Sequence, residues 1–205
     1  MKNKNLLIVF VKNSILGKVK TRLANTIGNE NALIVYKKLL EITKEAVENT
    51  KNCDTQIYYS DEIIENEWLK SDKFIQQGIN LGEKMKKAFS NGFNAGYKNI
   101  VLIGSDLSDI TSEIIHQSFE LLKNSDVVFG PAEDGGYYLV GMKKMQNSIF
   151  EDKPWSTDNL LSITLYELTN KKINFLKTLN DIDLYEDLKK HPSLMKLINK
   201  PKTFK

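Results

Sequence analysis

Residues 100–106 read Ile100-Val101-Leu102-Ile103-Gly104-Ser105-Asp106. A continuous apolar run that ends at glycine and serine is typical of a strand buried on both faces of a parallel sheet. The carboxylate of Asp106 follows the strand directly, at the edge where open α/β sheets bind their ligands. The stretch therefore predicts an α/β fold that presents an acid to a ligand.

Strand and helix patterns alternate on both sides of this stretch. We expect further strands at residues 6–11, 55–59, 127–130, 137–140 and 173–176, and helices at 30–49, 81–97, 112–123, 158–170 and 183–199. The last helix has Asp183 in N-cap position and Glu186 in capping-box position. The alternation favours a doubly wound α/β sheet in one domain over residues 1–200, with a loose tail at 201–205.

The polar region at residues 61–80 is harder to assign. Of its apolar side chains, those of Trp68, Phe74 and Ile75 are the best candidates for burial. We expect a short helix and a strand there.

The composition excludes several classes of protein. A net charge of +3, from lysines scattered along the chain, is too weak to predict a nucleic-acid partner. The apolar run from Leu6 to Val11 is too short for a membrane span or a signal sequence, so we expect a cytoplasmic protein. The chain has one cysteine, Cys53, and two histidines, His116 and His191, so its sequence offers no Cys/His cluster for zinc. The oligomeric state stays open, a homodimer included.

The segment at residues 131–141 is Pro131-Ala132-Glu133-Asp134-Gly135-Gly136-Tyr137-Tyr138-Leu139-Val140-Gly141. Gly135 and Gly136 permit positive φ and let a ligand approach the backbone closely. With the acids Glu133 and Asp134 just before them, they indicate a site for a polar ligand. The alternative is an ordinary hairpin turn, because Asp-Gly and Gly-Gly are favoured hairpin dipeptides.

The loop after the first strand is basic and holds Lys12, Gly17, Lys18, Lys20 and Arg22. It matches neither GxGxxG nor GxxxxGK[ST]. In an extended loop Lys18, Lys20 and Arg22 would point to one side and could bind a di- or triphosphate. The alternative is a solvated basic loop. Together with Asp106, the first interpretation predicts a metal–nucleotide site.

Seven blocks, in order along nearly the whole chain, resemble the bacterial radical-SAM/selenodomain-associated transferases. They are LIVFVK (7–12), GKVKTRL (17–23), LGEKM (81–85), VLIGSD (101–106), PAEDGGYYLVG (131–141), PWSTD (154–158) and DIDLYEDL (181–188). This family is similar to GT-A-fold glycosyltransferases and, more distantly, to molybdenum-cofactor and phospholactate guanylyltransferases. The chain departs from the family at residues 14–16 and 107–108, where prolines are usual, so loop geometry differs while the ionic groups remain.

The resemblance implies a GT-A-like fold and a nucleotide-linked substrate. We expect transfer of a sugar from a nucleoside-diphosphate sugar to a small acceptor. Asp106, with Asp158 as a second ligand, would bind Mg²⁺ or Mn²⁺ at the diphosphate, although capping of a helix also accounts for the residues around Asp158. The donor would be bound by Lys12, Gly17, Lys18, Lys20, Arg22, Gly135 and Gly136. Glu133 or Asp134 would orient the acceptor or act as base.

Two other functions suit the same residues. One is nucleotidyl transfer with release of pyrophosphate, because it also develops charge on phosphate oxygens that cations and a metal stabilise. The other is a non-catalytic nucleotide-binding module.

Overall fold

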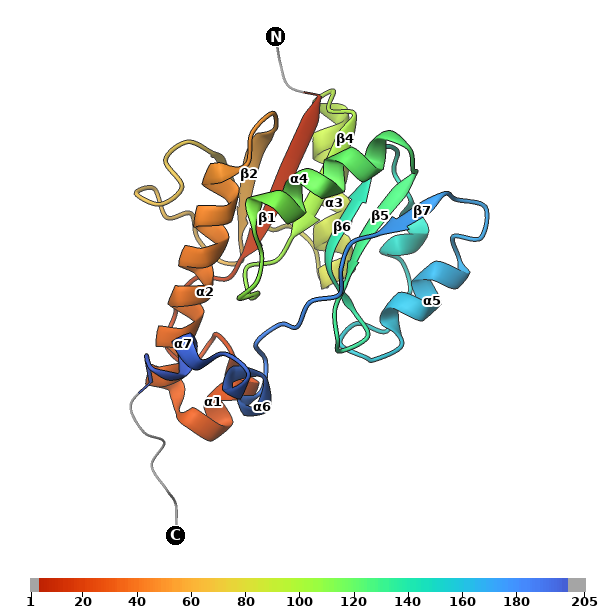
Figure 1. Cartoon of the computed structure of the whole chain (residues 1–205). Coiled ribbons are helices and arrows are strands. Elements are labelled where there is room, and N and C mark those ends of the chain that lie inside the picture. Colours follow the sequence, from red (N-terminus) through yellow and green to blue (C-terminus); the bar gives the residue numbers. More distant parts are fainter. Residues whose placement is uncertain (1–3, 199–205) are drawn as a thin grey trace.

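A computed structural model of the chain describes residues 4–198 (Figure 1). Its strands are β1 (Asn5–Val11), β2 (Asp54–Tyr59), β3 (Asp72–Ile75), β4 (Asn99–Ile103), β5 (Val127–Pro131), β6 (Tyr137–Met142) and β7 (Ile173–Phe175). Its α-helices are α1 (Thr21–Ile27), α2 (Asn29–Asn49), α3 (Leu81–Asn94), α4 (Ser112–Lys123), α5 (Leu160–Tyr166), α6 (Tyr185–Lys189) and α7 (Pro192–Met195), and a 3₁₀ turn, η1, spans Asn147–Ile149.

The strands form one mixed sheet in the order β3-β2-β1-β4-β6-β5-β7. β1 pairs in parallel with β2 and with β4, where Ile8 lies opposite Leu102. Only β6 runs against its neighbours β4 and β5, so the other strands end at one common edge. The chain proceeds from β1 outward to β3 and then returns to β4 on the other side of β1. This reversal is the point where doubly wound sheets form their ligand crevice.

The two faces of the sheet are covered by different helices (Figure 1). Leu7, Val9 and Val11 face a cluster that includes residues of α2 and α4. Leu6, Ile8 and Phe10 face a cluster with α3, and part of α5 packs against it. Because successive side chains of a strand point to opposite faces, the apolar run of β1 is buried on both sides. The predicted GT-A-like sheet, mixed and flanked by helices, is confirmed.

A third apolar cluster lies beyond the edge where the strands end. It joins α1, the first half of α2, α6 and α7 through Leu23, Ile27, Ala32, Val35, Leu39, Ile182, Leu188 and Leu194. We call this part the helical lobe, and Figure 1 shows it beneath the sheet around the lower end of α2.

The strap, residues 176–183, leads from β7 to the helical lobe. It passes the β5–β6 turn, where the Glu133 N–H donates to the Leu179 carbonyl at 3.0 Å.

Most predicted elements are confirmed, and α4 has the predicted bounds. Residues 61–80 contain β3 but no helix; there Trp68 is buried, whereas the Phe74 side chain is partly exposed. The helix expected at 158–170 is shorter, spanning Leu160–Tyr166. α1 was not expected at all. Within residues 4–198, no helix has the length and hydropathy of a membrane span.

The predicted closing helix at 183–199 is wrong in its course and its cap. Pro192 interrupts it, because proline has no N–H and its ring clashes with the preceding turn, so α6 ends and α7 begins there. The N-cap of α6 is Leu184 rather than Asp183. The Leu184 N–H donates to Oδ2 of Asp187 at 2.8 Å, so Asp187 occupies the capping-box position predicted for Glu186. Residue 199 and the predicted tail at 201–205 lie outside the described residues.

The glycine of the β5–β6 turn gives a test of this packing. A Cβ on Gly135 (φ +86°) would lie 1.8 Å from the Asp158 carbonyl oxygen, whereas Gly28 (φ +83°) has open space around it. We expect Gly28→Ala to lower the free energy of unfolding by about 1–2 kcal/mol through backbone strain alone. Gly135→Ala should cost roughly 3 kcal/mol or more, because it adds a clash to the same strain. Urea denaturation of both variants measures the difference, and equal losses would contradict this packing.

Candidate active site at the strand ends

An ion pair occupies the reversal point between β1 and β4. Nζ of Lys20 lies 3.2 Å from Oδ2 of Asp106, which follows β4. The Lys20 side chain is 5% exposed and that of Asp106 is 46% exposed, so the ammonium is buried while the carboxylate is open to solvent. The Lys20 ammonium is the main cause that lowers the pKa of Asp106. Asp106 is therefore an anion at neutral pH, as its predicted role requires.

The backbone of Lys20 has an unusual conformation. Lys20 precedes α1 at φ 46° and ψ 46°, in the left-handed region, and its carbonyl accepts the N–H of Ala24 at 2.8 Å. A side chain other than glycine adopts this region at a cost, and such residues gather at functional sites. Lys20 in this conformation is the N-cap of α1, which starts at Thr21, and the Lys20 side chain contacts Asp106.

The basic loop is thus not extended, and its cations do not share one side. Lys20 is buried against Asp106. Arg22 lies within α1, where its Nη1 is 2.6 Å from Oδ2 of Asp183 in the helical lobe. Lys18 is exposed, and Gly17 takes a positive φ of 77° in the turn before it. Of the three cations expected to act together, only Lys20 contacts Asp106.

Tyr36 of α2 fixes the two strand ends to each other. Its hydroxyl donates to the Lys12 carbonyl at 2.8 Å, accepts from the Lys12 N–H at 2.9 Å and lies 3.1 Å from Oγ of Ser105. Burial raises the pKa of Tyr36 to about 12, so the phenol is neutral.

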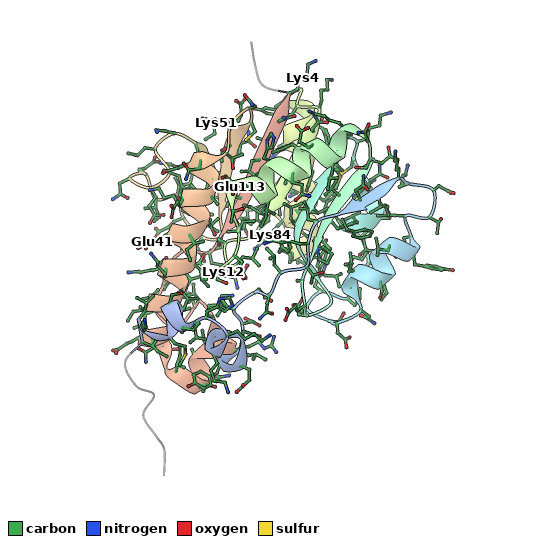
Figure 2. The ribbon with its side chains drawn as sticks, in the orientation of Figure 1. Lys4, Lys12, Glu41, Lys51, Lys84 and Glu113 are labelled. Carbon is green, nitrogen blue, oxygen red and sulfur yellow. The ribbon has the colours of Figure 1, made fainter. Side chains whose placement is uncertain are left out.

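Lys12 follows β1 and is exposed at the lower edge of the sheet (Figure 2). Beside it a pocket of about 140 Å³ is lined in part by Asn13, Tyr59 and Glu67.

The sequence interpretation missed Asp181 as a site residue. Asp181 belongs to the strap and forms an isolated antiparallel β-bridge with Leu107. The N–H of the next residue, Ile182, donates to the Asp106 carbonyl at 3.3 Å. Burial, with the nearby carboxylates of Asp106 and Asp134, raises the pKa of Asp181 from 3.8 to about 6, against the opposing effect of the Lys20 ammonium. Three carboxylates therefore interact at this edge. The available signal was that Asp181 follows β7, whose end faces the same edge.

The segment at residues 131–141 is a hairpin between antiparallel β5 and β6, so the hairpin interpretation is confirmed for its backbone. Oδ1 of Asp134 accepts the Gly136 N–H at 2.9 Å, which holds the turn. The close backbone approach expected of a ligand at Gly135 is made by the protein itself. The Gly135 Cα faces the backbone of Asp158, and its carbonyl accepts the Leu161 N–H at 3.0 Å.

The two acids of the hairpin have different surroundings. Oε2 of Glu133 lies 3.1 Å from Nζ of Lys190, at the end of α6, in an exposed ion pair. Asp134 is exposed and contributes to the electrostatics of Asp181. Asp134 is thus the hairpin acid that belongs to the carboxylate group around Asp106.

The two predicted metal ligands are not brought together as a closed site. Asp158 is exposed and its backbone packs on the hairpin turn. Among residues 4–198 no three or more His, Cys, Asp or Glu side chains are grouped to hold a metal ion. Any divalent ion at Asp106 would therefore need ligands from substrate and water as well.

Solved structures resemble this fold along most of the chain. A protein of Desulfovibrio desulfuricans G20, provisionally described as a nucleotide-diphospho-sugar transferase, has a TM-score of 0.84 and 29% identity, covering 96% of this chain and 94% of its own. The 4-diphosphocytidyl-2C-methyl-D-erythritol synthase of Anaerococcus prevotii DSM 20548 has a TM-score of 0.61 and 10% identity, covering 95% and 100%. A cytidylyltransferase of Leptospira borgpetersenii has a TM-score of 0.54 and 14% identity, covering 95% and 92%.

The family follows from the sequence itself. Residues 43–157 match DUF2064, described as an uncharacterized protein family conserved in bacteria, and the chain belongs to this family. No curated protein matches it significantly. The narrower radical-SAM-associated group stays a prediction.

The raised pKa of Asp181 has a measurable effect on stability. Because the folded pKa is about 6 and the ordinary value is 3.8, the folded protein holds this proton more tightly than the unfolded chain. The resulting stabilisation is present below the ordinary pKa and is lost as the pH rises through about 6. We therefore expect Asp181→Asn to be more stable than wild type at neutral pH in EDTA, with the difference closing below the ordinary pKa.

Urea denaturation across this pH range measures the effect. Asp183→Asn is the control, because it removes a nearby carboxylate that is paired with Arg22 and should give no gain at neutral pH. A pH-independent difference for Asp181→Asn would contradict the assignment.

Proposed function

We propose that this protein transfers a sugar from a nucleoside-diphosphate sugar to a small acceptor with the help of Mg²⁺ or Mn²⁺. The proposal depends chiefly on one observation, the buried Lys20 ammonium against the half-exposed Asp106 carboxylate at the reversal point of the sheet. The description of the similar Desulfovibrio protein as a nucleotide-diphospho-sugar transferase supports the same substrate class.

The cations at the strand ends suit a diphosphate. Lys20 is held at Asp106, and Lys12 is exposed beside it and also lowers the pKa of Asp106. Ammonium groups form short, strong hydrogen bonds to phosphate oxygens. Arg22 would add a bidentate contact if its exposed pair with Asp183 opened. In this arrangement Lys20 and Lys12 offset the negative charge of the donor.

The carboxylates at this edge fit a divalent cation. Asp106 and Asp181 offer hard oxygen donors, and they repel each other, which contributes to the raised pKa of Asp181. Mg²⁺ is commonly held by one or two carboxylates, with substrate phosphates and water as the remaining ligands. Asp106 and Asp181 would hold the ion, which when bound stabilises the charge of a leaving diphosphate. Asp158 is not required for this site.

Asp134 is our candidate for acceptor binding. Its carboxylate is fixed by the Gly136 N–H, and it lies close enough to Asp181 to affect its pKa. A carboxylate placed in this way can orient an acceptor hydroxyl or take its proton. Glu133 is the weaker candidate, because it already pairs with Lys190.

The likeness to cytidylyltransferases makes nucleotidyl transfer the second candidate. The same cations and metal would serve it, since both reactions develop charge on phosphate oxygens. The products distinguish the two: nucleoside diphosphate indicates sugar transfer, and pyrophosphate indicates nucleotidyl transfer. Nucleotide binding without turnover of any acceptor would instead indicate a binding module.

A thermal-shift panel of nucleoside diphosphates, triphosphates and nucleotide sugars, with Mn²⁺ or with EDTA, tests the proposal. A ligand that binds only the folded state raises stability by RT ln(1 + [L]/Kd). We expect a nucleoside diphosphate to stabilise wild type much more with Mn²⁺ than with EDTA, and Asp106→Asn to lose most of that difference, because the amide lacks the charge that attracts the ion. Equal nucleotide affinity with Mn²⁺ and with EDTA, measured by calorimetry, would refute metal dependence.

Asp134→Asn tests the acceptor role separately from folding. Asparagine keeps the Oδ1 acceptor for the Gly136 N–H, so the stability of the variant should match that of wild type. Turnover should fall by roughly 10²-fold or more, as it does on loss of a positioned acid or base. Glu133→Gln is the matched control and should retain most turnover. Wild-type turnover in Asp134→Asn would reduce Asp134 to a turn former.

A further inference from the structure

Lys20 lies where the proposed function would place a positive metal ion. Its ammonium is 3.2 Å from Oδ2 of Asp106, on the same carboxylate that would bind the cation. We propose that Lys20 is a displaceable counter-ion, which keeps a divalent cation away from Asp106 in the free protein and turns to the donor's diphosphate when cation and donor bind together. This inference rests on the proposed function and adds an order to its binding steps.

The burial of the two partners explains why the cation alone would bind weakly. The Lys20 side chain is 5% exposed, so its ammonium depends on nearby carboxylates for a counter-charge, and Asp106 is the one in ion-pair contact with it. Removing one partner of a buried ion pair leaves an uncompensated charge, which is strongly unfavourable. A divalent ion at Asp106 would take that partner away and would add a second positive charge beside the ammonium. Both effects oppose binding of the cation by itself.

A diphosphate removes both costs at once. Its oxygens give Lys20 a new anionic partner and give the cation further ligands. Cation and donor should therefore bind cooperatively, and linkage requires that each raises the affinity of the other by the same factor. Such couplings are typically about 5-fold to 150-fold.

The local geometry suits an exchange of partners at the ammonium. The Lys20 side chain is packed and its backbone has φ 46° before α1, while the Asp106 side chain is partly exposed to solvent. Only the far end of the side chain needs to change partner. Arg22 does not meet this description, because its side chain is 65% exposed and its pair with Asp183 is screened by water.

Mn²⁺ binding without nucleotide, followed by electron paramagnetic resonance, measures the step directly. Lys20→Met removes the ammonium and keeps a packed apolar stem. We expect it to bind Mn²⁺ about tenfold more tightly than wild type, within the usual range of couplings, and to bind a nucleoside diphosphate more weakly. Lys20→Arg keeps the charge and should keep weak Mn²⁺ binding. Opposite changes in the two affinities would not arise from simple loss of a phosphate contact.

Lys38→Met is the matched control. Lys38 pairs with Glu41 at 3.0 Å on α2, so this variant makes the same change in net charge at another carboxylate. Figure 2 shows Glu41 on the outer side of α2, away from Lys12 at the strand ends. Its affinities for Mn²⁺ and nucleotide should equal those of wild type. Circular dichroism verifies folding, and Lys20→Gly, which accepts the positive φ, replaces Lys20→Met if the latter does not fold.

The outcomes separate this inference from the proposed function. Mn²⁺ affinity in a folded Lys20→Met or Lys20→Gly no tighter than in wild type would overturn the counter-ion role, even if nucleotide binding is observed. Failure of wild type to bind any nucleoside diphosphate, with or without Mn²⁺, would instead overturn the proposed function. Tighter Mn²⁺ binding in the variants, together with weaker nucleotide binding, supports both.

Discussion

The parallel pairing of β1 with β4, both buried on their two faces, is the constraint on which the rest of this structure depends. Leu6, Leu7, Ile8 and Val9 are fully buried, so helices must cover the sheet on both sides. Parallel neighbours also need crossover connections, which carry those helices. The chain can add strands beyond both β1 and β4 only by reversing between them. The reversal point of the sheet is thus a consequence of burying these two strands.

The same pairing determines which polar groups meet. Because β1 and β4 run in the same direction, Lys12 and Asp106 emerge at one edge, and Tyr36 ties the two ends through Lys12 and Ser105. Lys20 reaches Asp106 from the start of α1. The positive charge of the buried Lys20 ammonium is thus balanced by the negative charge of the partly exposed Asp106 carboxylate. Any anionic ligand must compete with a carboxylate for Lys20, and any cation must compete with Lys20 for Asp106.

The sequence predicted the sheet well because its signals are local. The apolar run at 100–103 places β4 and therefore Asp106, and the helical spacing at 112–123 gives the bounds of α4. It failed where tertiary contacts decide the structure. α1 is short, and its buried Leu23 and Ile27 pack in the helical lobe with residues from the far end of the chain. No local pattern reports that packing, or the left-handed turn at Lys20 that precedes it.

The candidate site was predictable to the same extent. Asp106 and Lys20, two of the predicted site residues, form an ion pair, whereas Arg22 pairs with Asp183. The place of Asp181 after β7 indicates the edge near which it lies, but its position beside Asp106 depends on bonds between the irregular strap and distant parts of the chain. The segment that packs against Gly135 could not be predicted from the sequence either. A glycine pattern shows that the backbone is approached closely, but not whether the approaching group is a ligand or, as here, the chain at Asp158.

The strap explains how the Asp181 carboxylate stays close to those of Asp106 and Asp134, which repel it. Leu179 donates to the Pro131 carbonyl at 3.1 Å, and the Ile182 N–H donates to that of Asp106. Leu179 and Ile182 are also buried, and each such side chain stabilises the fold by about 1.5–3 kcal/mol. Apolar burial on both sides of Asp181 thus offsets the unfavourable placement of its carboxylate. Since main-chain bonds hold that position beforehand, a ligand that neutralises the carboxylates need not spend binding energy on ordering the backbone.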